Sequence, residues 1–188
     1  YWDGNKLIGF DIGPGNALID TFVKQNYNLD FDANGILASY GYPNSSIIRK
    51  FMTNNFFGQT YPKSLDKLHF NSFFNDRLFK NLNNFDALAT LTYLTIESIA
   101  AALKLLPQKV EFIVISGGGQ HNTYLVEKLK QNIKCDIYTS NEINIPGDMI
   151  EAEMIAYITA RSLNKLEFTY PETTGVKKPS SGGEVCFP

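Results

Sequence analysis

One stretch, residues 10–20, constrains this 188-residue chain most, because it predicts a strand, a tight turn and a helix in immediate succession. Residues 6–10 are apolar enough for a buried strand, and the Gly-Pro-Gly-Asn sequence of residues 13–16 then forces a turn. Asn16 is placed to cap the helix that follows. The next apolar residues recur with the spacing of one helix face: Leu18, Ile19, Phe22 and Val23.

A strand that feeds a glycine-rich turn and a helix leaves backbone N–H groups pointing outward at the positive end of that helix. Such a loop suits an anion or a polar sugar, and its candidate binding residues are Gly13, Gly15 and Asn16. A plain connection whose glycines only allow positive φ is the equally open alternative. The motif alone does not decide between the two.

The composition indicates one globular domain with a sizeable core, since 44% of the residues are hydrophobic and 19% are charged. A net charge of −2 without a cluster of Lys or Arg argues against nucleic acid as a partner. We expect no apolar run of membrane-spanning length and see no signal-peptide pattern, which favours a cytoplasmic protein without a membrane partner.

The cysteines and histidines of the chain do not indicate a metal site. Cys135 and Cys186 lie far apart and form no CxxC pair, which also suits a reducing compartment. His69 and His121 are too few and too scattered for a metal site. Unless the fold brings one of them to a cleft, we interpret both histidines as surface or local hydrogen-bonding residues, and we expect no metal ligand in this chain.

The beginning of the chain is predicted to be a β-hairpin, because Asp3-Gly4 is a strong two-residue turn signal. Its first arm would be only Tyr1-Trp2, and its second arm would be residues 6–10. A two-residue arm cannot form hydrogen bonds with all the backbone N–H and C=O groups of a partner strand of ordinary length. The chain is therefore expected to begin within a sheet.

The middle of the chain is predicted to be helical. Short helices are expected over residues 36–38 and 47–52, and an extended segment is expected around Pro62. Residues 78–85 give no clear prediction. A long helix is expected between Asp86, as N-cap, and Pro107.

The second half alternates between strands and helices. Strands are predicted over residues 110–115 and 136–139, and helices from Asn122 and over residues 149–164. The last helix carries one apolar side and is expected to have Asp148 as its N-cap; that side contains Ala152, Ile155, Ala156, Thr159 and Leu163. The alternation predicts an α/β domain with a mixed or parallel sheet.

A second glycine run, Gly117 to Gly119, follows the predicted central strand and precedes a helix, as the first glycine loop does. Ligands bind beyond the carboxyl ends of strands in open α/β sheets. Three glycines would also let a flat or charged ligand approach the backbone. Close packing of strand on helix is the alternative, although one glycine would satisfy it.

Four stretches taken together resemble the anhydro-N-acetylmuramic acid kinase family: FDIGPGNALID, PKS followed by FN, ISGGGQHNTYL and IPGDMIEA. TTG and SSGG near the C-terminus are similar to the end of that family. The resemblance runs along nearly the whole chain in the right order. It implies the ribonuclease-H-like, actin-like ATPase fold, in which two domains enclose ATP and Mg²⁺. Residues 1–188 would then be the C-terminal domain, a mixed sheet with flanking helices that is incomplete at its N-terminus.

The family's reaction opens the anhydro ring of 1,6-anhydro-N-acetylmuramic acid with water while ATP phosphorylates the 6-oxygen, as part of peptidoglycan recycling. By resemblance, the adenosine-side residues are Gly117, Gly118, Gly119 and Asn122. Those near nucleotide and sugar are Gly13, Gly15 and Asn16, and those expected to bind substrate are Asp11, Lys63 and Ser64. Glu151 would face the sugar and orient water or hydroxyls. The alternative for Glu151 is a first-turn carboxylate that only favours the helix N-terminus.

The family's N-terminal half, with its first phosphate-binding hairpin and catalytic base, does not appear in these residues. We therefore expect the chain alone to be inactive and to pair with an N-terminal half or with itself. Lys67 stands in a stretch where the family usually has an arginine, whose bidentate contact a lysine cannot reproduce. A non-catalytic remnant of the same fold is the alternative. An unrelated sugar-binding domain would require the two glycine loops to lie at opposite ends of the sheet.

Overall fold

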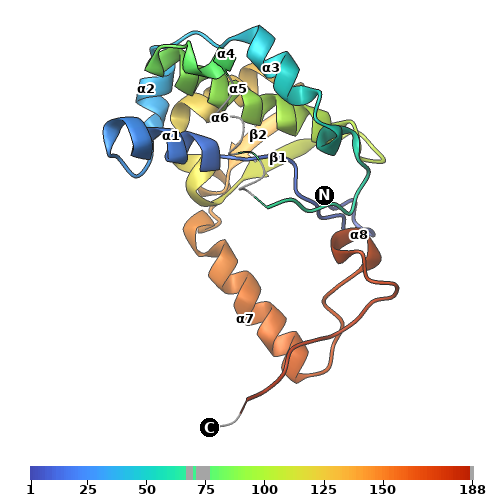
Figure 1. Cartoon of the computed structure of the whole chain (residues 1–188). Coiled ribbons are helices and arrows are strands. Elements are labelled where there is room, and N and C mark those ends of the chain that lie inside the picture. The colour runs from blue at the N-terminus through green and yellow to red at the C-terminus, as the bar shows by residue number, and fades with distance from the viewer. Residues whose placement is uncertain (67–69, 71–76, 187–188) are drawn as a thin grey trace.

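Helix α5 (Asn84–Leu103) runs through the middle of the molecule and organises its packing (Figure 1). The computed structural model describes residues 1–66, 70 and 77–186. His69 and Lys67, discussed above, lie outside these residues. Helices α1 (Ala17–Tyr27), α2 (Ile36–Ser39) and α3 (Ser45–Met52) pack on α5, and each lies where a helix was predicted. Their shared core includes Leu18, Ile19, Phe22, Val23, Ile47, Phe51, Leu88, Leu91 and Leu94.

The expectation that no apolar run reaches membrane-spanning length is wrong for α5. This helix has 20 residues, and its apolar window has a mean hydropathy of 1.2, the only such helix within the described ranges. However, 61% of that window is buried inside the molecule, and residues such as Leu88 and Leu94 are fully enclosed. Here the apolar run forms the core of a folded domain.

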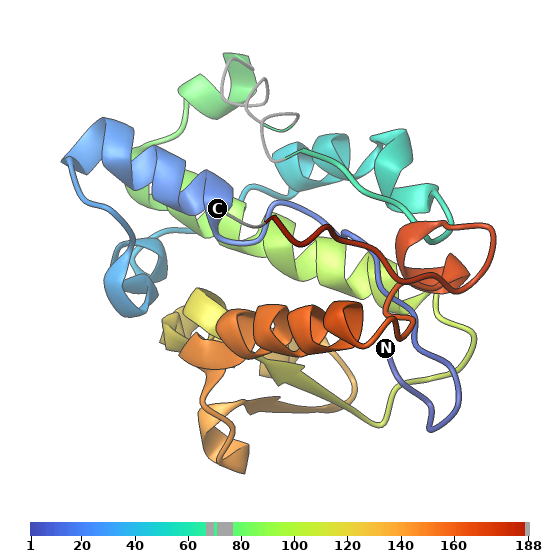
Figure 2. The same ribbon diagram turned by 90° about the horizontal axis from the view of Figure 1, so that it is seen from below.

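A small sheet packs on the other side of α5. Strands β1 (Phe112–Ile115) and β2 (Asp136–Thr139) run parallel and lie side by side (Figure 2), with α6 (Thr123–Asn132) connecting them. Ile113 and Ile115 point toward the cluster formed by α5 and α6, whereas Phe112 and Val114 are exposed. The predicted α/β class is confirmed. The expected central strand is instead the edge of the two-stranded sheet that the described residues form.

The strand predicted over residues 6–10 is wrong. Trp2 and Leu7 form a single antiparallel bridge. Beside it the Tyr1 ammonium donates to the Ile8 carbonyl at 2.8 Å, and the Ile8 N–H donates to the Tyr1 carbonyl at 2.9 Å. The predicted turn between them is present, and its Asp3 carboxylate accepts two backbone N–H groups. The hairpin ends after one bridge because its first arm provides only two residues.

Two predicted helix caps are wrong and one is only partly right. Asn83, rather than Asp86, caps α5 by accepting the Asp86 N–H at 2.9 Å. Asp148 does not cap the last helix, because its carboxylate binds side chains of another loop. Asn16 occupies the N-cap position of α1, but its side chain makes no capping hydrogen bond. The sequence places helix starts correctly to within a few residues, while tertiary contacts choose the capping group.

Helix α7 (Ile150–Leu163) runs away from the body of the molecule (Figure 1). Every residue of α7 is at least partly exposed, including Ile155 at 58% and Leu163 at 62%. The apolar side predicted for this helix therefore exists in the sequence but is not buried among the described residues. After α7 the chain returns to α8 (Pro171–Thr174), which lies close to the N-terminus.

The remaining elements are short. One is the α-helix α4 (Arg77–Lys80), in the region that gave no clear prediction. The 3₁₀ helices are η1 (Ala33–Gly35), η2 (Asn55–Gly58), η4 (Gly117–His121), η5 (Asn141–Ile143) and η6 (Gly147–Met149). Of these, η1, η4 and η6 border the candidate site. They place loop residues near the start of α1 and near the carboxyl ends of the strands.

Candidate functional site

A pocket of about 420 Å³ lies where the two predicted glycine loops approach each other. Its polar lining comes from α1, η1, η4 and the start of α6, and consists of Asn16, Asp20, Asp32, Asn34, His121 and Asn122. Gly118 of the second glycine run also lines it. The two loops therefore do not lie at opposite ends of the fold, which removes the argument for an unrelated sugar-binding domain.

At the first loop, the two glycines have different roles. A Cβ at Gly13 would come within 2.7 Å of the Ser98 side chain, so close packing against α5 accounts for this glycine. Gly15 has a positive φ of 55°, and its carbonyl accepts a 2.7 Å hydrogen bond from the Thr95 hydroxyl. The packing interpretation therefore applies to Gly13, while Gly15 shapes the turn that presents Asn16.

Asn16 lines the pocket with an unsatisfied acceptor. Its Oδ1 is buried and has no hydrogen-bond partner among the described residues. A buried carbonyl oxygen without a donor costs free energy, which a ligand N–H or O–H would recover. Asn16 is thus the residue of the first loop with the clearest capacity to bind a ligand.

The second glycine run is open. Among the described residues, no atom lies within 4 Å of a Cβ placed at Gly117 or Gly118, and at Gly119 the nearest is Ile115 at 3.7 Å. Gly117 has a positive φ of 66° at the sharp turn out of β1. Close packing of strand on helix therefore does not account for this run. Its backbone is available to a ligand.

Asn122 combines a structural contact with a place in the pocket. Its buried side chain caps α6 by accepting the Leu125 N–H at 3.0 Å. The close approach of η1 leaves no room for a side chain at Gly35, which packs against Asn122 and Tyr124. Asn122 thus joins the second glycine loop to the wall formed by η1.

Two carboxylates in the pocket were missed by sequence reasoning. Asp32 is buried and accepts the backbone N–H groups of Leu37 and Ala38 at 2.9 and 3.0 Å. Burial, and secondarily the charge of Asp32, raise the pKa of Asp20. Asp20 is an ordinary polar residue of a predicted helix, and Asp32 is an ordinary turn residue. Nothing in the sequence therefore indicated that the two carboxylates are neighbours.

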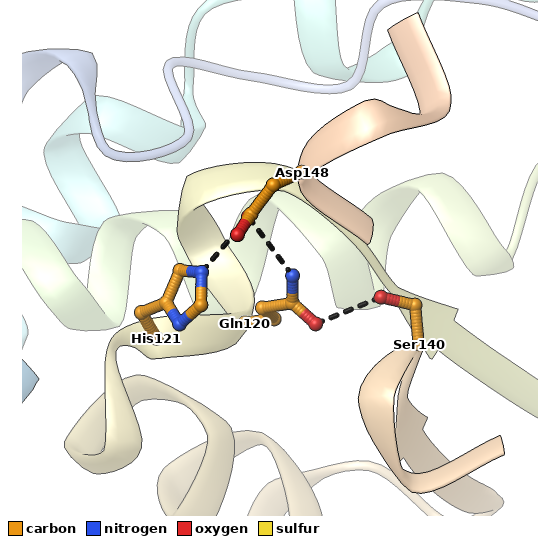
Figure 3. Close-up of polar contacts among 4 residues, drawn as sticks. All are labelled: Gln120, His121, Ser140 and Asp148. Atoms are coloured by element: carbon orange, nitrogen blue, oxygen red, sulfur yellow. Dashed lines mark hydrogen bonds and ion pairs between the residues drawn. The ribbon is translucent and has the colours of Figure 1, made fainter. Parts of the chain in front are cut away.

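A polar network connects the second glycine loop to the segment that begins α7 (Figure 3). The buried Ser140 hydroxyl donates to Gln120 Oε1 at 2.7 Å, and Gln120 Nε2 donates to Asp148 Oδ1 at 3.2 Å. His121 Nε2 lies 2.9 Å from the same carboxylate oxygen, and the fold also brings His121 into the lining of the pocket. The hydrogen bond from His121 is the largest contribution that lowers the pKa of Asp148.

The candidate substrate residues Asp11, Lys63 and Ser64 form a separate cluster. The Ser64 hydroxyl and the Leu65 N–H both donate to Asp11 Oδ2 at 2.9 Å, while the Asp11 N–H donates to the Lys63 carbonyl at 2.9 Å. Lys63 Nζ donates to the Phe56 carbonyl at 2.7 Å and lies 4.4 Å from the centre of the Phe56 ring. Partial burial lowers the pKa of Lys63.

Glu151 belongs neither to the pocket lining nor to the cluster of Asp11, Lys63 and Ser64. It is exposed in the first turn of α7. The structure thus brings Asn16, Gly118 and Asn122 together, and separately Asp11, Lys63 and Ser64. Within the described ranges, no three His, Cys, Asp or Glu residues are grouped to hold a metal ion. The pocket offers amide, hydroxyl-binding and carboxylate groups suited to a polar organic ligand.

Comparison with known proteins gives a consistent result. The family model described as anhydro-N-acetylmuramic acid kinase matches residues 2–188. Proteins with that name from Zymomonas mobilis and Methylobacterium nodulans are 37% and 34% identical, over 98% and 97% of this chain. A third, from Brucella anthropi, is 33% identical over 98% of it. The chain spans about half the length of these curated relatives: 50%, 48% and 49%.

Proposed function

Because the chain belongs to the anhydro-N-acetylmuramic acid kinase family, we propose that it provides the C-terminal half of such a sugar kinase. In this proposal the chain is a ribonuclease-H-like domain that binds the adenosine part of ATP and contributes to the sugar site. The reaction is ATP-dependent hydrolytic ring opening and phosphorylation of 1,6-anhydro-N-acetylmuramic acid. The product is N-acetylmuramic acid 6-phosphate.

The observation that carries the proposal is that Asn16 of the first glycine loop and Gly118 of the second line the same pocket. The unsatisfied Asn16 Oδ1 accepts a donor on the nucleoside, and Asp20 and Asp32 favour further ligand N–H or O–H groups. The open backbone of Gly117 and Gly118 lets a flat base or sugar approach. These groups fit a nucleoside, which has several donors around a planar ring.

In this proposal the chain binds ATP but holds no Mg²⁺ ion by itself. The described residues contain no cluster of three His, Cys, Asp or Glu side chains that could bind the ion. Mg²⁺ usually keeps several waters and binds through nucleotide phosphates with one or two carboxylates. It would neutralise charge on the phosphates, and we assign it no ligand among the described residues. The catalytic base and the remaining phosphate contacts then come from the N-terminal half.

On the sugar side, Glu151 would orient the attacking water or a sugar hydroxyl by accepting its hydrogen bond. Its exposure in the first turn of α7 leaves the carboxylate free to meet a ligand. The Asp11 carboxylate, already engaged by Ser64, would act with Lys63 as a preformed edge of the sugar site. Phosphoryl transfer depends on positioning, so both halves are needed.

The test is phosphorylation of 1,6-anhydro-N-acetylmuramic acid by this chain alone and by a fusion that places the N-terminal half of the Zymomonas mobilis relative before Tyr1. We expect activity only in the fusion. Asn16→Ala should weaken ATP binding about tenfold, the size expected for one hydrogen bond. Asn132→Ala is the control, since its exposed side chain bonds only to the Lys128 carbonyl in its own helix. A folded fusion without activity or ATP binding would identify a non-catalytic remnant.

A further inference from the structure

The pocket between the two glycine loops contains two carboxylates and no strong cation. Asp20 and Asp32 line it, whereas no Lys or Arg does so among the described residues. The imidazole of His121 also lines it, but Nε2 of that ring lies 2.9 Å from the Asp148 carboxylate. A phosphate or carboxylate placed in this pocket would therefore meet like charge without a compensating Lys or Arg. The pocket favours the uncharged part of a ligand.

Of the two carboxylates, that of Asp20 is available to a ligand. The oxygens of the buried Asp32 already accept the Leu37 and Ala38 N–H groups at 2.9 and 3.0 Å. Within the part of the chain that the structure describes, the Asp20 carboxylate has no hydrogen-bond or ion-pair partner. Burial and the charge of Asp32 raise the pKa of Asp20, as expected of a carboxylate that no group donates to.

Asn16 lies one helical turn before Asp20, and the Asp20 N–H donates to the Asn16 carbonyl at 2.8 Å. Side chains at this spacing are neighbours on a helix surface, and both line the pocket. The buried Oδ1 of Asn16 also lacks a donor among the described residues. A ligand that satisfies Asn16 and Asp20 must therefore carry hydrogen-bond donors at two points.

The same pocket presents an aromatic ring. Phe31 lines it and is 63% exposed. Gly118 lines it as well, and no described atom lies within 4 Å of a Cβ placed there. Nucleobases stack on exposed aromatic rings whatever their sequence. The pocket thus combines a surface for a planar ring with acceptors for hydroxyl or amine groups.

We propose that Asp20 recognises the ribose of the nucleotide, its carboxylate accepting hydrogen bonds from the 2′- and 3′-hydroxyl groups. Two adjacent hydroxyls supply two donors, and an ionised carboxylate supplies two acceptor oxygens. The base would lie against Phe31, with the phosphates directed away from Asp20 and Asp32. The inference rests on the proposed function and names the ligand group that this carboxylate selects.

The charge of the pocket favours the nucleoside over the sugar substrate. The acid group of 1,6-anhydro-N-acetylmuramic acid is ionised at neutral pH. Asp20 and Asp32 would repel that group, since no Lys or Arg of the described residues lines the pocket. The alternative donor to Asp20 is the exocyclic amine of the base. Removing the ribose hydroxyls separates these two assignments.

The test is an NMR titration of this chain with adenosine and with 2′,3′-dideoxyadenosine. Adenosine should bind at least about tenfold more tightly, because hydrogen bonds to a charged group are the stronger ones. Asp20→Asn should reduce this ratio to less than about threefold, mainly by weakening adenosine. Asp30→Asn is the matched control and should keep the wild-type ratio. It removes the same charge from a carboxylate outside the pocket lining, which is 81% exposed and pairs with Lys24.

Equal affinity of the wild type for the two nucleosides would overturn the proposal. So would an unchanged ratio in Asp20→Asn, and an equal loss for both nucleosides would then assign the carboxylate to the base. The measurement needs neither the N-terminal half nor kinase activity. Adenosine binding without selection for the hydroxyls refutes this inference alone, whereas failure to bind adenosine and ATP refutes the proposed function with it.

Discussion

Gln120 donates a hydrogen bond to the carboxylate of Asp148 at 3.2 Å and thereby joins the loop after β1 to the turn before α7 (Figure 3). Asp148 carries no donor when ionised, so the Gln120 amide must direct its NH₂ group toward it. Ser140, which is fully buried, donates to the remaining amide oxygen at 2.7 Å. Because Gly118 lines the pocket two residues before Gln120, and Glu151 follows Asp148 by three residues, this hydrogen bond ties the segment of the proposed sugar residue to the nucleotide loop.

The hydrogen bond between Gln120 and Asp148 should be lost when Gln120 alone is changed to a carboxylate, and it should return when Asp148 is changed to an amide as well. Gln120→Glu sets two carboxylates against each other and should lower the melting temperature by roughly 2–4 °C. Asp148→Asn alone should have a smaller effect, because an amide oxygen still accepts from Gln120. The double variant recreates a donor–acceptor pair and should recover most of the loss in a double-mutant cycle. Additive losses in thermal unfolding would contradict the assigned junction.

His121 should control the titration of Asp148. Its hydrogen bond lowers the pKa of Asp148, so the ionised Asp148 carboxylate stabilises the fold above the ordinary aspartate range, near pH 4. That stabilisation is lost as the pH falls through the lowered pKa. His121→Ala should raise the Asp148 pKa in a carboxyl NMR titration. Glu142, whose pKa is lowered mainly by the Thr139 N–H, should keep its titration midpoint in the variant.

Gly147 should not accept a side chain. A Cβ there would overlap the Ser140 hydroxyl and the Gln120 amide, which are held in place by each other. Gly147→Ala should therefore destabilise the chain by about 1–3 kcal/mol in urea unfolding. Gly118→Ala should change stability by less than about 0.5 kcal/mol, because its Cβ meets no described atom within 4 Å. Similar losses in the two variants would contradict this packing.

Asn122 should show its structural contribution separately from any ligand contact. Asn122→Ala removes the cap of α6 and should lower the free energy of unfolding by about 1 kcal/mol. Asn122→Ser supplies another capping oxygen and should restore most of it. If the serine variant recovers stability but binds ATP more weakly than the wild type, the amide itself contacts the nucleotide. Equal binding by the two proteins would confine Asn122 to capping.

Local pattern predicted the elements with the strongest signals. The apolar spacing after Asn16 gave α1, the β-branched run within residues 110–115 gave β1, and Asn122 marked the start of α6. Each of these depends on propensity and periodicity within a few residues. The ordered motifs along the chain also gave the family, which the match over residues 2–188 confirms.

Tertiary contacts decided the rest. Asp148 looked like a cap for α7, but Gln120 and His121 reach its carboxylate from a loop 27–28 residues away in sequence. Asp20 and Asp32 are neighbours only through the fold, which places both in the lining of one pocket. The strand predicted over residues 6–10 did not extend, because a strand needs a partner of its own length to satisfy its backbone groups. The sequence determined which segments form helices and strands; only the fold decided which polar groups meet, because such contacts depend on distance in space.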